Sequence, residues 1–533
     1  MLAQIRRLTP LLLLALPILM TALSLEFKRA QGPYWASGKV DPSYSYLLGS
    51  LAYAEGKPSM CCLHPGVTVQ INGEWVLRAS HAVIGQGALV ADVLRDPEVY
   101  AAILGFEEIL LYAAAMLAAG WMIYRVTNRM ELALLIQTPA FFNAGNFLWL
   151  NPIAPEALLY GVVILAGALA VVHEVDPGRR RLISIAFGVL TGVGLATKIT
   201  YLPAAILPMI VLDSWVGLIV YLLAASVSFA ALSVPHWETV DNALYFWNQL
   251  LHKQGLHGSG QEGHPHLADL AAIFGEYFRS DPFFTSMLLA CFAATAWLLW
   301  ARRATAPKRL LIGLTVCELL QIALASRQFS LRYLSPAYAL LAAHAVILVY
   351  CLGPGVRRIA TWASIAGVLV LVAARSSEVR ASASELRASR HDSRKVVDGI
   401  LAQRPGSTAI AYYGANTIPF ALQFGNAWVY RAFAKPLEDL YPKTLFWDAY
   451  RRVFENFGST VTIDSLGDCN NLLLEGTAFG VQPMGFSPPD HVSVEELGRF
   501  NGEAFYSMTC DVTAAPPPVQ PAPAPPKSTN PAY

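Results

Sequence analysis

Apolar segments long enough to cross a membrane recur along most of the chain. A helix crosses the hydrocarbon core with about 20 apolar residues. Eleven segments have roughly this length and composition: residues 8–25, 104–124, 131–149, 155–174, 182–197, 200–213, 215–233, 284–301, 309–325, 332–352 and 359–374. The recurrence predicts an all-α polytopic membrane bundle of about 11 transmembrane helices, because helices satisfy their own backbone hydrogen bonds in lipid.

The composition supports a chain embedded in lipid. Of its 533 residues, 55% are hydrophobic and only 14% are charged, whereas soluble domains carry about 25% charged residues. The net charge of +1 excludes a nucleic-acid partner held by electrostatic attraction. Arg6 and Arg7 precede the first apolar segment and no small-residue cleavage site follows it. We therefore expect a retained first span rather than a removed signal peptide.

Basic residues in the short connections predict which side of the membrane each connection faces. Cytoplasmic connections are enriched in Lys and Arg. With the N-terminus inside, the inside connections are basic: residues 125–129, 179–181, 302–309 and 357–358. The outside connections are long or polar: residues 26–103, 150–154, 234–283 and 326–331. The first outside loop, 26–103, and the fourth, 234–283, are therefore predicted to be extracytoplasmic.

The composition changes after residue 375, where the predicted transmembrane module 1–375 ends. Residues 375–404 have helical spacing, and short β-like runs follow at Ser407–Tyr413, Trp428–Arg431 and Val461–Ile463. These runs predict a small extracytoplasmic α/β domain over residues 376–513. The Pro-rich residues 514–533 are expected to form a disordered tail.

Two carboxylates are predicted at outer membrane ends. Asp41 follows the first span and precedes Tyr44, Leu47 and Leu48, a spacing that favours a helix lying along the membrane surface. Glu156 begins the fourth span. Each carboxylate also has a purely structural interpretation, because Asp caps helices and an acid in the first turn complements the helix dipole.

Three cations are predicted on the same membrane face: Lys198 after the fifth span, and Arg327 and Arg332 beside the tenth. Charges at membrane depth are costly and usually have a partner or a function. A carboxylate can accept a proton from a hydroxyl, while Lys and Arg can neutralise a phosphate leaving group. The five charges together predict a site for acid–base and phosphate chemistry.

Four short motifs occur in this outer region. The first joins Asp41 and Tyr44 to His64-Pro65-Gly66, and the second is Glu156 in Pro-Glu-Ala-Leu-Leu. The third runs from Gly194 to Lys198 and is followed by Pro203, and the fourth is Arg332-Tyr333-Leu334-Ser335-Pro336. Over residues 1–375 this pattern resembles the GT-C superfamily of integral membrane glycosyltransferases, in particular the branch with protein O-mannosyltransferases and the lipid A aminoarabinose transferase. Pro42 stands where many members have Glu, and Gly66 replaces a second proline.

The resemblance implies a cell-envelope glycosyltransferase of a bacterial inner membrane, active on the extracytoplasmic side. The implied donor is a polyprenyl-phosphate-linked sugar, and the implied acceptor is a glycan, a lipid or a protein. The implied reaction is an inverting displacement that needs no obligatory cofactor or metal. Asp41 would be the catalytic base with Glu156 assisting it, and the donor phosphate would lie near Lys198, Arg332 and Arg327. Tyr44, His64 and Tyr333 would contact substrate.

A metal site is the alternative for the fourth outside loop. His252, His257, His264 and His266 cluster there, and imidazole is a common metal ligand. Their spacing matches no established site, and the glycines among them favour a mobile lid. Cys469 and Cys510 could form a disulfide in an oxidising compartment.

Two other functions compete with the transferase. A lipid or glycan transporter or flippase is expected to show paired halves with broken helices and midplane charges, whereas these charges gather at the predicted outer face. An inactive scaffold of the same superfamily is the other alternative. Elsewhere, Glu107 and Glu108 are expected at a solvated helix start, and Glu318 in a polar contact between helices.

Overall fold

The computed structural model divides into two compact units. It describes residues 9–510 apart from 36–39, 60–65, 177, 179, 235–236, 238–266, 302–306, 327–329, 353, 404–407, 412–416, 443, 449–452, 462–471, 478–491 and 501–502. The first unit, here the bundle unit, comprises Met1–Lys28, Cys62–Val69 and Gly105–Ser382. The second, the sheet unit, comprises Arg29–Cys61, Gln70–Leu104 and Ala383–Tyr533. Most of the first outside loop thus shares its contacts with the C-terminal part of the chain.

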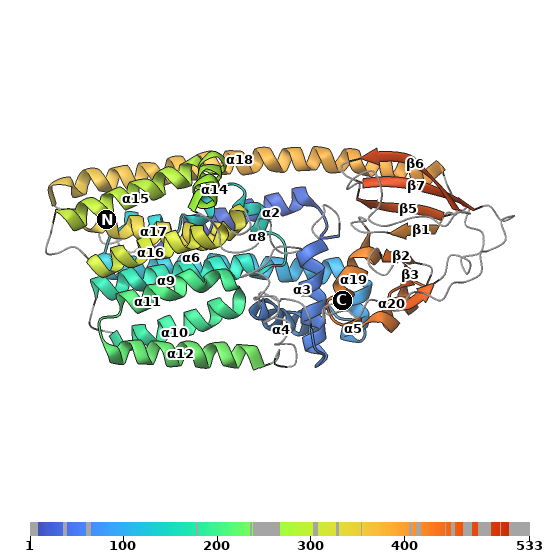
Figure 1. Cartoon of the computed structure of the whole chain (residues 1–533), viewed down its shortest axis with the longest axis horizontal. Coiled ribbons are helices and arrows are strands. Elements are labelled where there is room, and N and C mark those ends of the chain that lie inside the picture. Colours follow the sequence, from blue (N-terminus) through green and yellow to red (C-terminus); the bar gives the residue numbers. More distant parts are fainter. Residues whose placement is uncertain are drawn as a thin grey trace. The chain divides into compact units, whose positions relative to one another are not determined.

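The bundle unit is built from helices (Figure 1). Its longer helices are α2 (Ala15–Gln31), α6 (Pro97–Thr127), α9 (Pro155–Val175), α10 (Arg180–Thr197), α11 (Leu202–Val211), α12 (Trp215–Ser233), α14 (Leu267–Ser280), α15 (Pro282–Trp300), α16 (Lys308–Ala325), α17 (Ser335–Tyr350) and α18 (Pro354–Gln403). The end of α2, the start of α6 and the end of α18 belong to the sheet unit. Its short elements are η1 (Thr9–Leu14), α7 (Met130–Ile136), η2 (Pro139–Phe141), α8 (Asn146–Leu150), η4 (Ile199–Tyr201) and η6 (Leu331–Leu334).

Eight helices of the described residues are long and apolar enough to cross a membrane. They are Pro10–Gln31, Pro97–Thr127, Pro155–Val175, Arg180–Thr197, Trp215–Ser233, Pro282–Trp300, Leu331–Tyr350 and Gly355–Ser389. Each coincides with a predicted span, and the prediction of a polytopic helical membrane protein is confirmed. In the ninth predicted span, α16 is helical throughout but carries Lys308, Arg309 and Glu318.

Two predicted spans differ from the structure. The predicted span 131–149 is wrong as a continuous helix, since α7, η2 and α8 occupy it in sequence. Pro139 has no backbone N–H for a helical hydrogen bond. Near this break, the Gln137 side chain donates to the carbonyl oxygens of Leu13 and Met116, both at 3.0 Å. The span predicted at 200–213 is only the short apolar stretch Ile199–Val211.

Helix α17 forms the centre of the bundle unit. Most of its side chains are buried, whereas those of α12 are largely exposed and apolar, as expected for a helix that faces lipid. Gly167 on α9 lies against α17, where an added Cβ would come 2.9 Å from the Ala343 side chain. Gly188 and Gly192 bring α10 equally close to α12. Small residues of this kind let membrane helices approach each other.

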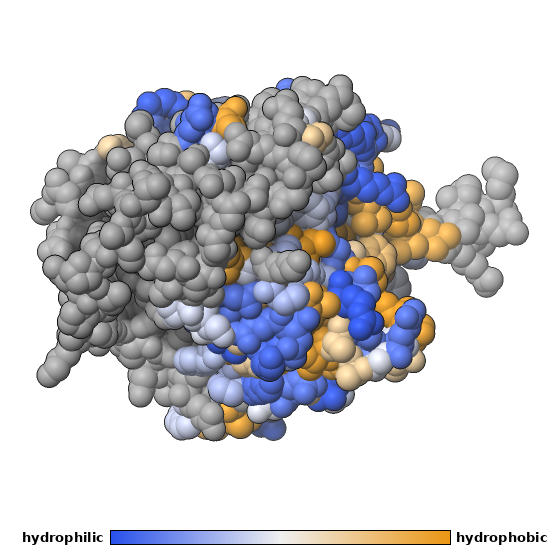
Figure 2. All heavy atoms as spheres, turned by 90° about the vertical axis from the view of Figure 1, so that its right-hand side faces the viewer, coloured by the Kyte–Doolittle hydropathy of each residue, from blue (hydrophilic) through white to orange (hydrophobic). Residues whose placement is uncertain are grey.

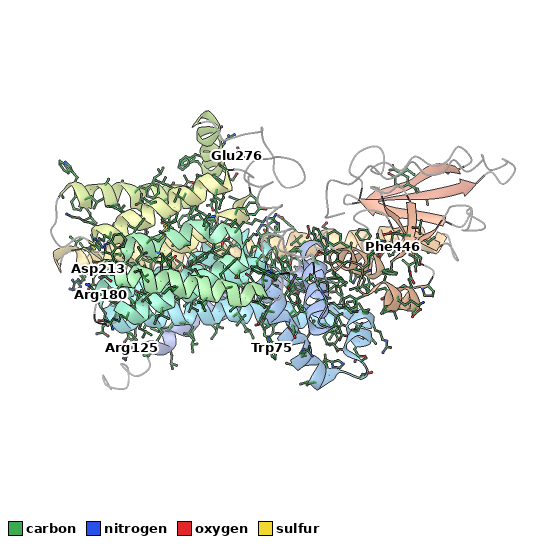
Figure 3. All side chains as sticks on the ribbon, turned by 60° about the horizontal axis from the view of Figure 1, so that its bottom comes forward. Trp75, Arg125, Arg180, Asp213, Glu276 and Phe446 are labelled. Carbon is green, nitrogen blue, oxygen red and sulfur yellow. The ribbon has the colours of Figure 1, made fainter. Side chains whose placement is uncertain are left out.

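Basic residues from two of the predicted inside connections lie at one end of the bundle unit. Arg125, Arg180 and Asp213 are found there together (Figure 3), and Arg180 forms an ion pair with Asp213. The residues after α9 and after α11 therefore meet at this end. This is the end that the charge pattern predicts to be cytoplasmic.

The sheet unit combines helices with a mixed sheet of seven strands. Its helices are α3 (Val40–Ala54), most of α4 (Val67–Ile84), α5 (Leu89–Arg95), α19 (Ile418–Ala427) and α20 (Ala434–Leu440). Its strands are β1 (Thr408–Ala411), β2 (Leu445–Asp448), β3 (Val453–Asn456), β4 (Ser459–Val461), β5 (Leu472–Thr477), β6 (Val492–Phe500) and β7 (Glu503–Cys510), in the order β4-β3-β2-β1-β5-β7-β6. β1 is parallel to β2 and β5, and the other pairs are antiparallel.

Helix α3 packs against α19, which joins the first outside loop to the C-terminal part within the sheet unit. An added Cβ on Gly425 would lie 2.5 Å from the Tyr44 carbonyl oxygen, so only glycine permits this approach. At the other end of α3, Lys57 donates to the Ala432 carbonyl oxygen at 3.2 Å and lies 4.8 Å from the Phe433 ring centre. The coloured part of the face seen in Figure 2 carries hydrophilic groups interspersed with hydrophobic ones.

The predicted α/β fold of the C-terminal part is confirmed, with one strand misplaced. The predicted runs Ser407–Tyr413 and Val461–Ile463 overlap β1 and β4. Trp428–Arg431 is a turn after α19 instead, in which Tyr430 and Arg431 have φ of 53° and 57°, a left-handed conformation that interrupts a strand. The tail 514–533 and Cys469 lie outside the described residues.

Candidate active site

Lys198 lies where the chain breaks between α10 and α11. Its backbone is extended, with φ −161° and ψ 138°, so it ends α10 and precedes η4. Its amide nitrogen still donates to the Gly194 carbonyl oxygen at 2.9 Å. An added Cβ on Gly194 would come 2.4 Å from the Tyr201 ring. The segment Gly194–Lys198 therefore needs glycine for η4 to fold back beside α10.

The ammonium group of Lys198 forms a buried ion pair with Glu156. Their Nζ and Oε1 atoms are 2.6 Å apart, and the two side chains are 6% and 4% exposed. Pro155 and Glu156 open α9, whose first turn presents backbone N–H groups to an acid. Separating such a pair leaves a buried charge uncompensated, which typically costs about 3–5 kcal/mol. The pair therefore holds the ends of α9 and α10 together.

Glu108 supports the same helix start. Its Oε2 accepts the Ala154 amide proton at 3.2 Å, although Glu108 itself is only 2% exposed. The expectation of a solvated helix start at Glu108 is therefore wrong. The sequence alone offers no signal for this contact, because it joins two helices that are distant in the chain.

Tyr333 and Arg332 complete the group around Lys198. The Lys198 Nζ lies 5.1 Å from the centre of the Tyr333 ring, and the Arg332 Cζ lies 4.8 Å from the same centre. Arg332 donates to the Tyr333 hydroxyl oxygen at 2.8 Å and lies 4.7 Å from the centre of the Trp149 ring. Cations at these distances interact favourably with aromatic rings. Two cations thus share one ring, and one carboxylate accompanies them.

The first outside loop also contacts the segment that ends at Lys198. The Gly66 amide donates to the Thr197 carbonyl oxygen at 3.0 Å, and the Thr68 hydroxyl donates to the Thr197 hydroxyl at 2.9 Å. Gly66 has φ of 62°, a conformation that suits glycine. The predicted element His64-Pro65-Gly66 therefore ends beside Thr197, the residue before Lys198. His64 and Pro65 lie outside the described residues.

A second polar group in the bundle unit was missed by the sequence analysis. Asp281 is only 2% exposed and caps α15 by accepting the Phe284 amide proton at 3.1 Å. Its Oδ2 also accepts from the Asn143 side chain at 2.7 Å and from the Tyr338 hydroxyl at 2.8 Å. The dipeptide Asp281-Pro282 before an apolar segment was the available signal, since it resembles Pro155-Glu156.

Asp41 and Tyr44 belong to the sheet unit. Asp41 is exposed, and its φ of −91° and ψ of 123° are those of a residue preceding a helix. This backbone agrees with the interpretation of Asp41 as a helix cap, an arrangement that leaves its carboxylate at the surface of the unit.

Tyr44 is buried, and its hydroxyl donates to Glu98 Oε1 at 2.8 Å. Burial and the neighbouring Glu98 carboxylate raise the pKa of Tyr44, so the hydroxyl stays protonated. Glu98 also accepts the amide protons of Tyr34 and Trp35, at 2.7 and 3.2 Å. Glu98 therefore fixes the chain before α3 against the start of α6, a role that the sequence analysis did not foresee.

The other predicted residues cannot be placed. Arg327 and the four histidines of the fourth outside loop, His252, His257, His264 and His266, lie outside the described residues. Within the described part of the chain, no group of three or more His, Cys, Asp or Glu residues could hold a metal ion.

One family model of known proteins matches a segment of the chain. Residues 101–326 match the model of glycosyltransferase family 87. This segment includes Glu156 and Lys198. The predicted enzyme class, a glycosyltransferase, is borne out for this segment by the match. Among curated proteins, none matches the sequence.

Two solved structures resemble the whole chain weakly. One is ArnT from Cupriavidus metallidurans bound to undecaprenyl phosphate, with 14% identity, a TM-score of 0.48, and coverage of 95% of this chain and 99% of that one. The other is the same protein in the apo state, with 14% identity, a TM-score of 0.43, and coverage of 92% and 97%.

Proposed function

We propose that the protein transfers a sugar from a polyprenyl-phosphate-linked donor to an extracytoplasmic acceptor. The support is the family match over residues 101–326 together with the motifs at Glu156, Lys198 and Arg332. The acceptor would be a glycan, a lipid or a protein, and the membrane a bacterial inner membrane. The basic end of the bundle unit would face the cytoplasm.

The observation that carries the proposal is the group formed by Lys198, Glu156, Tyr333 and Arg332. A metal-free site for a phosphodiester donor must offer positive charge where the leaving phosphate develops its negative charge. Two cations and one carboxylate leave this group with a net positive charge. Lys198 would keep its contact with Glu156 and donate another of its three N–H groups to a phosphate oxygen when the donor binds.

The chemistry would be a single inverting displacement. Asp41 would accept the proton of the acceptor hydroxyl, and the hydroxyl oxygen would attack the anomeric carbon. The bond between that carbon and the phosphate oxygen would break, and polyprenyl phosphate would leave with its charge held by Lys198 and Arg332. Glu156, still held by Lys198, would orient the acceptor. Tyr333 would contact the sugar, while Tyr44 would support α3 through Glu98.

Release of polyprenyl phosphate tests this proposal without knowledge of the acceptor. The purified protein would be placed in liposomes with a panel of polyprenyl-phosphate-linked sugars and a membrane extract that supplies acceptors. Mass spectrometry would then measure the polyprenyl phosphate released. We expect release by the wild type and none above background by Asp41→Asn. Glu55→Gln is the matched control, because Glu55 is an exposed carboxylate just beyond the other end of α3. Equal release by wild type and Asp41→Asn would remove Asp41 as the base.

A further inference from the structure

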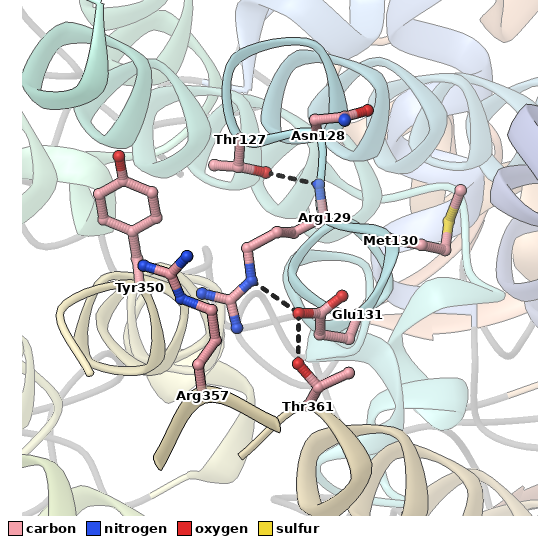
Figure 4. A pocket seen from close by; sticks show the side chains of 8 residues that line it. All are labelled: Thr127, Asn128, Arg129, Met130, Glu131, Tyr350, Arg357 and Thr361. Atoms are coloured by element: carbon pink, nitrogen blue, oxygen red, sulfur yellow. Dashed lines mark hydrogen bonds and ion pairs between the residues drawn. The ribbon is translucent and has the colours of Figure 1, made fainter. Parts of the chain in front are cut away.

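A pocket opens at the basic end of the bundle unit. None of its lining residues belongs to the group around Lys198. It has a volume of about 370 Å³ and is lined by Thr127, Asn128, Arg129, Met130, Glu131, Tyr350, Arg357 and Thr361 (Figure 4). These residues come from the end of α6, the start of α7, the end of α17 and the start of α18. Neither the transferase chemistry nor the motifs assign this pocket a role.

The single carboxylate of the pocket is already occupied. Glu131 Oε1 accepts from Arg129 Nε at 2.6 Å and from the Thr361 hydroxyl at 2.9 Å. Both contacts are drawn in Figure 4. The Arg129 charge is therefore balanced locally by Glu131. Its Nη2 atom, however, is buried and has no hydrogen-bond acceptor among the described residues.

Arg357 brings a second positive charge without a matching acid. It is exposed at the start of α18. Among the described residues, none of the ion pairs involves its guanidinium. The helix dipoles do not supply the missing negative charge, because two helices end at the pocket and two begin there, so that their opposite partial charges largely offset each other. The pocket therefore keeps an excess of one positive charge.

The turn between α6 and α7 sets the direction of Arg129. Asn128 has φ of 52°, and the Thr127 hydroxyl accepts the Arg129 amide proton at 3.2 Å. Arg129 Nη1 reaches the Val349 carbonyl oxygen at 3.4 Å, across to the end of α17. The side chain is thus held between two helices, with only 13% of it exposed, and it does not need to be ordered when a ligand arrives.

We propose that this pocket binds a phosphate group, supplied either by the headgroup of an anionic phospholipid or by free phosphate. Arginine binds phosphate oxygens with two parallel N–H groups. Both the exposed Arg357 and the mostly buried Arg129 line the pocket. It lies at the ends of the spans Pro97–Thr127 and Leu331–Tyr350, where lipid headgroups are found. Basic pockets between helices on the cytoplasmic side are known to take anionic headgroups.

Arg357→Gln, with Arg358→Gln as the control, tests the pocket. Both arginines are exposed neighbours on α18, but only Arg357 lines the pocket. Full-length protein would be reconstituted in phosphatidylcholine nanodiscs with a small fraction of phosphatidylglycerol. Native mass spectrometry would count the phosphatidylglycerol that stays bound. In phosphatidylcholine alone, the thermal midpoint would be measured with and without inorganic phosphate.

The two measurements distinguish the sources of the phosphate group. If a lipid is the ligand, Arg357→Gln retains about fivefold less phosphatidylglycerol than wild type and Arg358→Gln, the effect of one basic residue at an anionic surface. If free phosphate is the ligand, phosphate raises the thermal midpoint of wild type and Arg358→Gln but not of Arg357→Gln. The proposal is overturned if Arg357→Gln changes neither the retention of phosphatidylglycerol nor the effect of phosphate on the thermal midpoint. It is also overturned if both variants lose binding equally.

Discussion

Two buried contacts between a carboxylate and a nitrogen base in the bundle unit have similar geometry and different surroundings. Glu156 and Lys198 join the start of α9 to the end of α10 at 2.6 Å. Glu318 on α16 and His344 on α17 are 3.0 Å apart, and both are fully buried. The second pair confirms the expected polar contact between helices at Glu318. Both pairs connect neighbouring helices, so burial alone does not separate a site from a structural contact.

The difference lies in what surrounds each pair. His344 and Glu318 lie inside regular helices, and the second imidazole nitrogen of His344 is 2.8 Å from the Thr295 hydroxyl. Protein groups therefore occupy both ends of the imidazole. Lys198 instead lies at an interruption of the backbone, and both Lys198 and Arg332 lie near the Tyr333 ring. An excess of positive charge at a helix break indicates an anion site, whereas a closed pair within helices indicates cohesion.

The largest expected effect is on sugar transfer by Lys198→Met. Removing a positive charge that stabilises a leaving group lowers the rate by about 10²–10³-fold. The same change leaves Glu156 buried without its partner, so the folded fraction must be measured alongside the activity. The double variant Lys198→Met/Glu156→Gln removes both charges and should recover stability without recovering transfer. Recovery of transfer in the double variant would make Lys198 a purely structural residue.

The corresponding change in the other pair is Glu318→Gln. We expect a loss of about 1–3 kcal/mol in the free energy of unfolding, because the substitution alters a fully buried hydrogen bond to His344. Transfer per folded molecule should stay within about twofold of wild type, a factor that corresponds to less than 1 kcal/mol. Denaturation followed by tryptophan fluorescence and the release assay would measure the two quantities. A selective loss of transfer would place Glu318 in the site and contradict its assignment as a structural contact.

Arg332→Lys tests whether shape matters as well as charge. Lysine keeps the positive charge but not the planar guanidinium that lies near the Trp149 and Tyr333 rings. We expect about a tenfold weaker apparent affinity for the donor, equivalent to ~1.4 kcal/mol. Arg332→Gln, which removes the charge too, should be weaker still. Equal affinities for the lysine variant and wild type would show that charge alone suffices.

The last prediction concerns the backbone that presents Lys198. Gly194→Ala would place a methyl group against the Tyr201 ring and should cost about 1–3 kcal/mol of stability. The control is Gly275→Ala on α14, where nothing lies within 4 Å of the added atom. That variant should be neutral or slightly stabilising, since alanine favours helices. Thermal midpoints that fall equally in both variants would contradict the close approach at Gly194.

The sequence predicted the local parts of this arrangement better than the contacts between distant parts. Span lengths and the Pro155-Glu156 and Gly194–Lys198 motifs are encoded locally, so α9, α10 and their charged ends could be predicted. The break at Pro139 was hidden by an apolar composition that fits a helix equally well. Glu108 and Glu98 could not be assigned, because each binds backbone amides that only the folded chain brings near. The dipeptide Asp281-Pro282 was a local signal for a capped helix start, although it was not used in the prediction.

Binding of polyprenyl phosphate tests most directly whether the group around Lys198 is the donor site. The affinity of wild type, Lys198→Met/Glu156→Gln and Glu318→Gln would be compared by native mass spectrometry in the same detergent. The account predicts at least a tenfold loss of affinity in the Lys198→Met/Glu156→Gln variant and an unchanged affinity in Glu318→Gln. Equal affinities for all three proteins would contradict it.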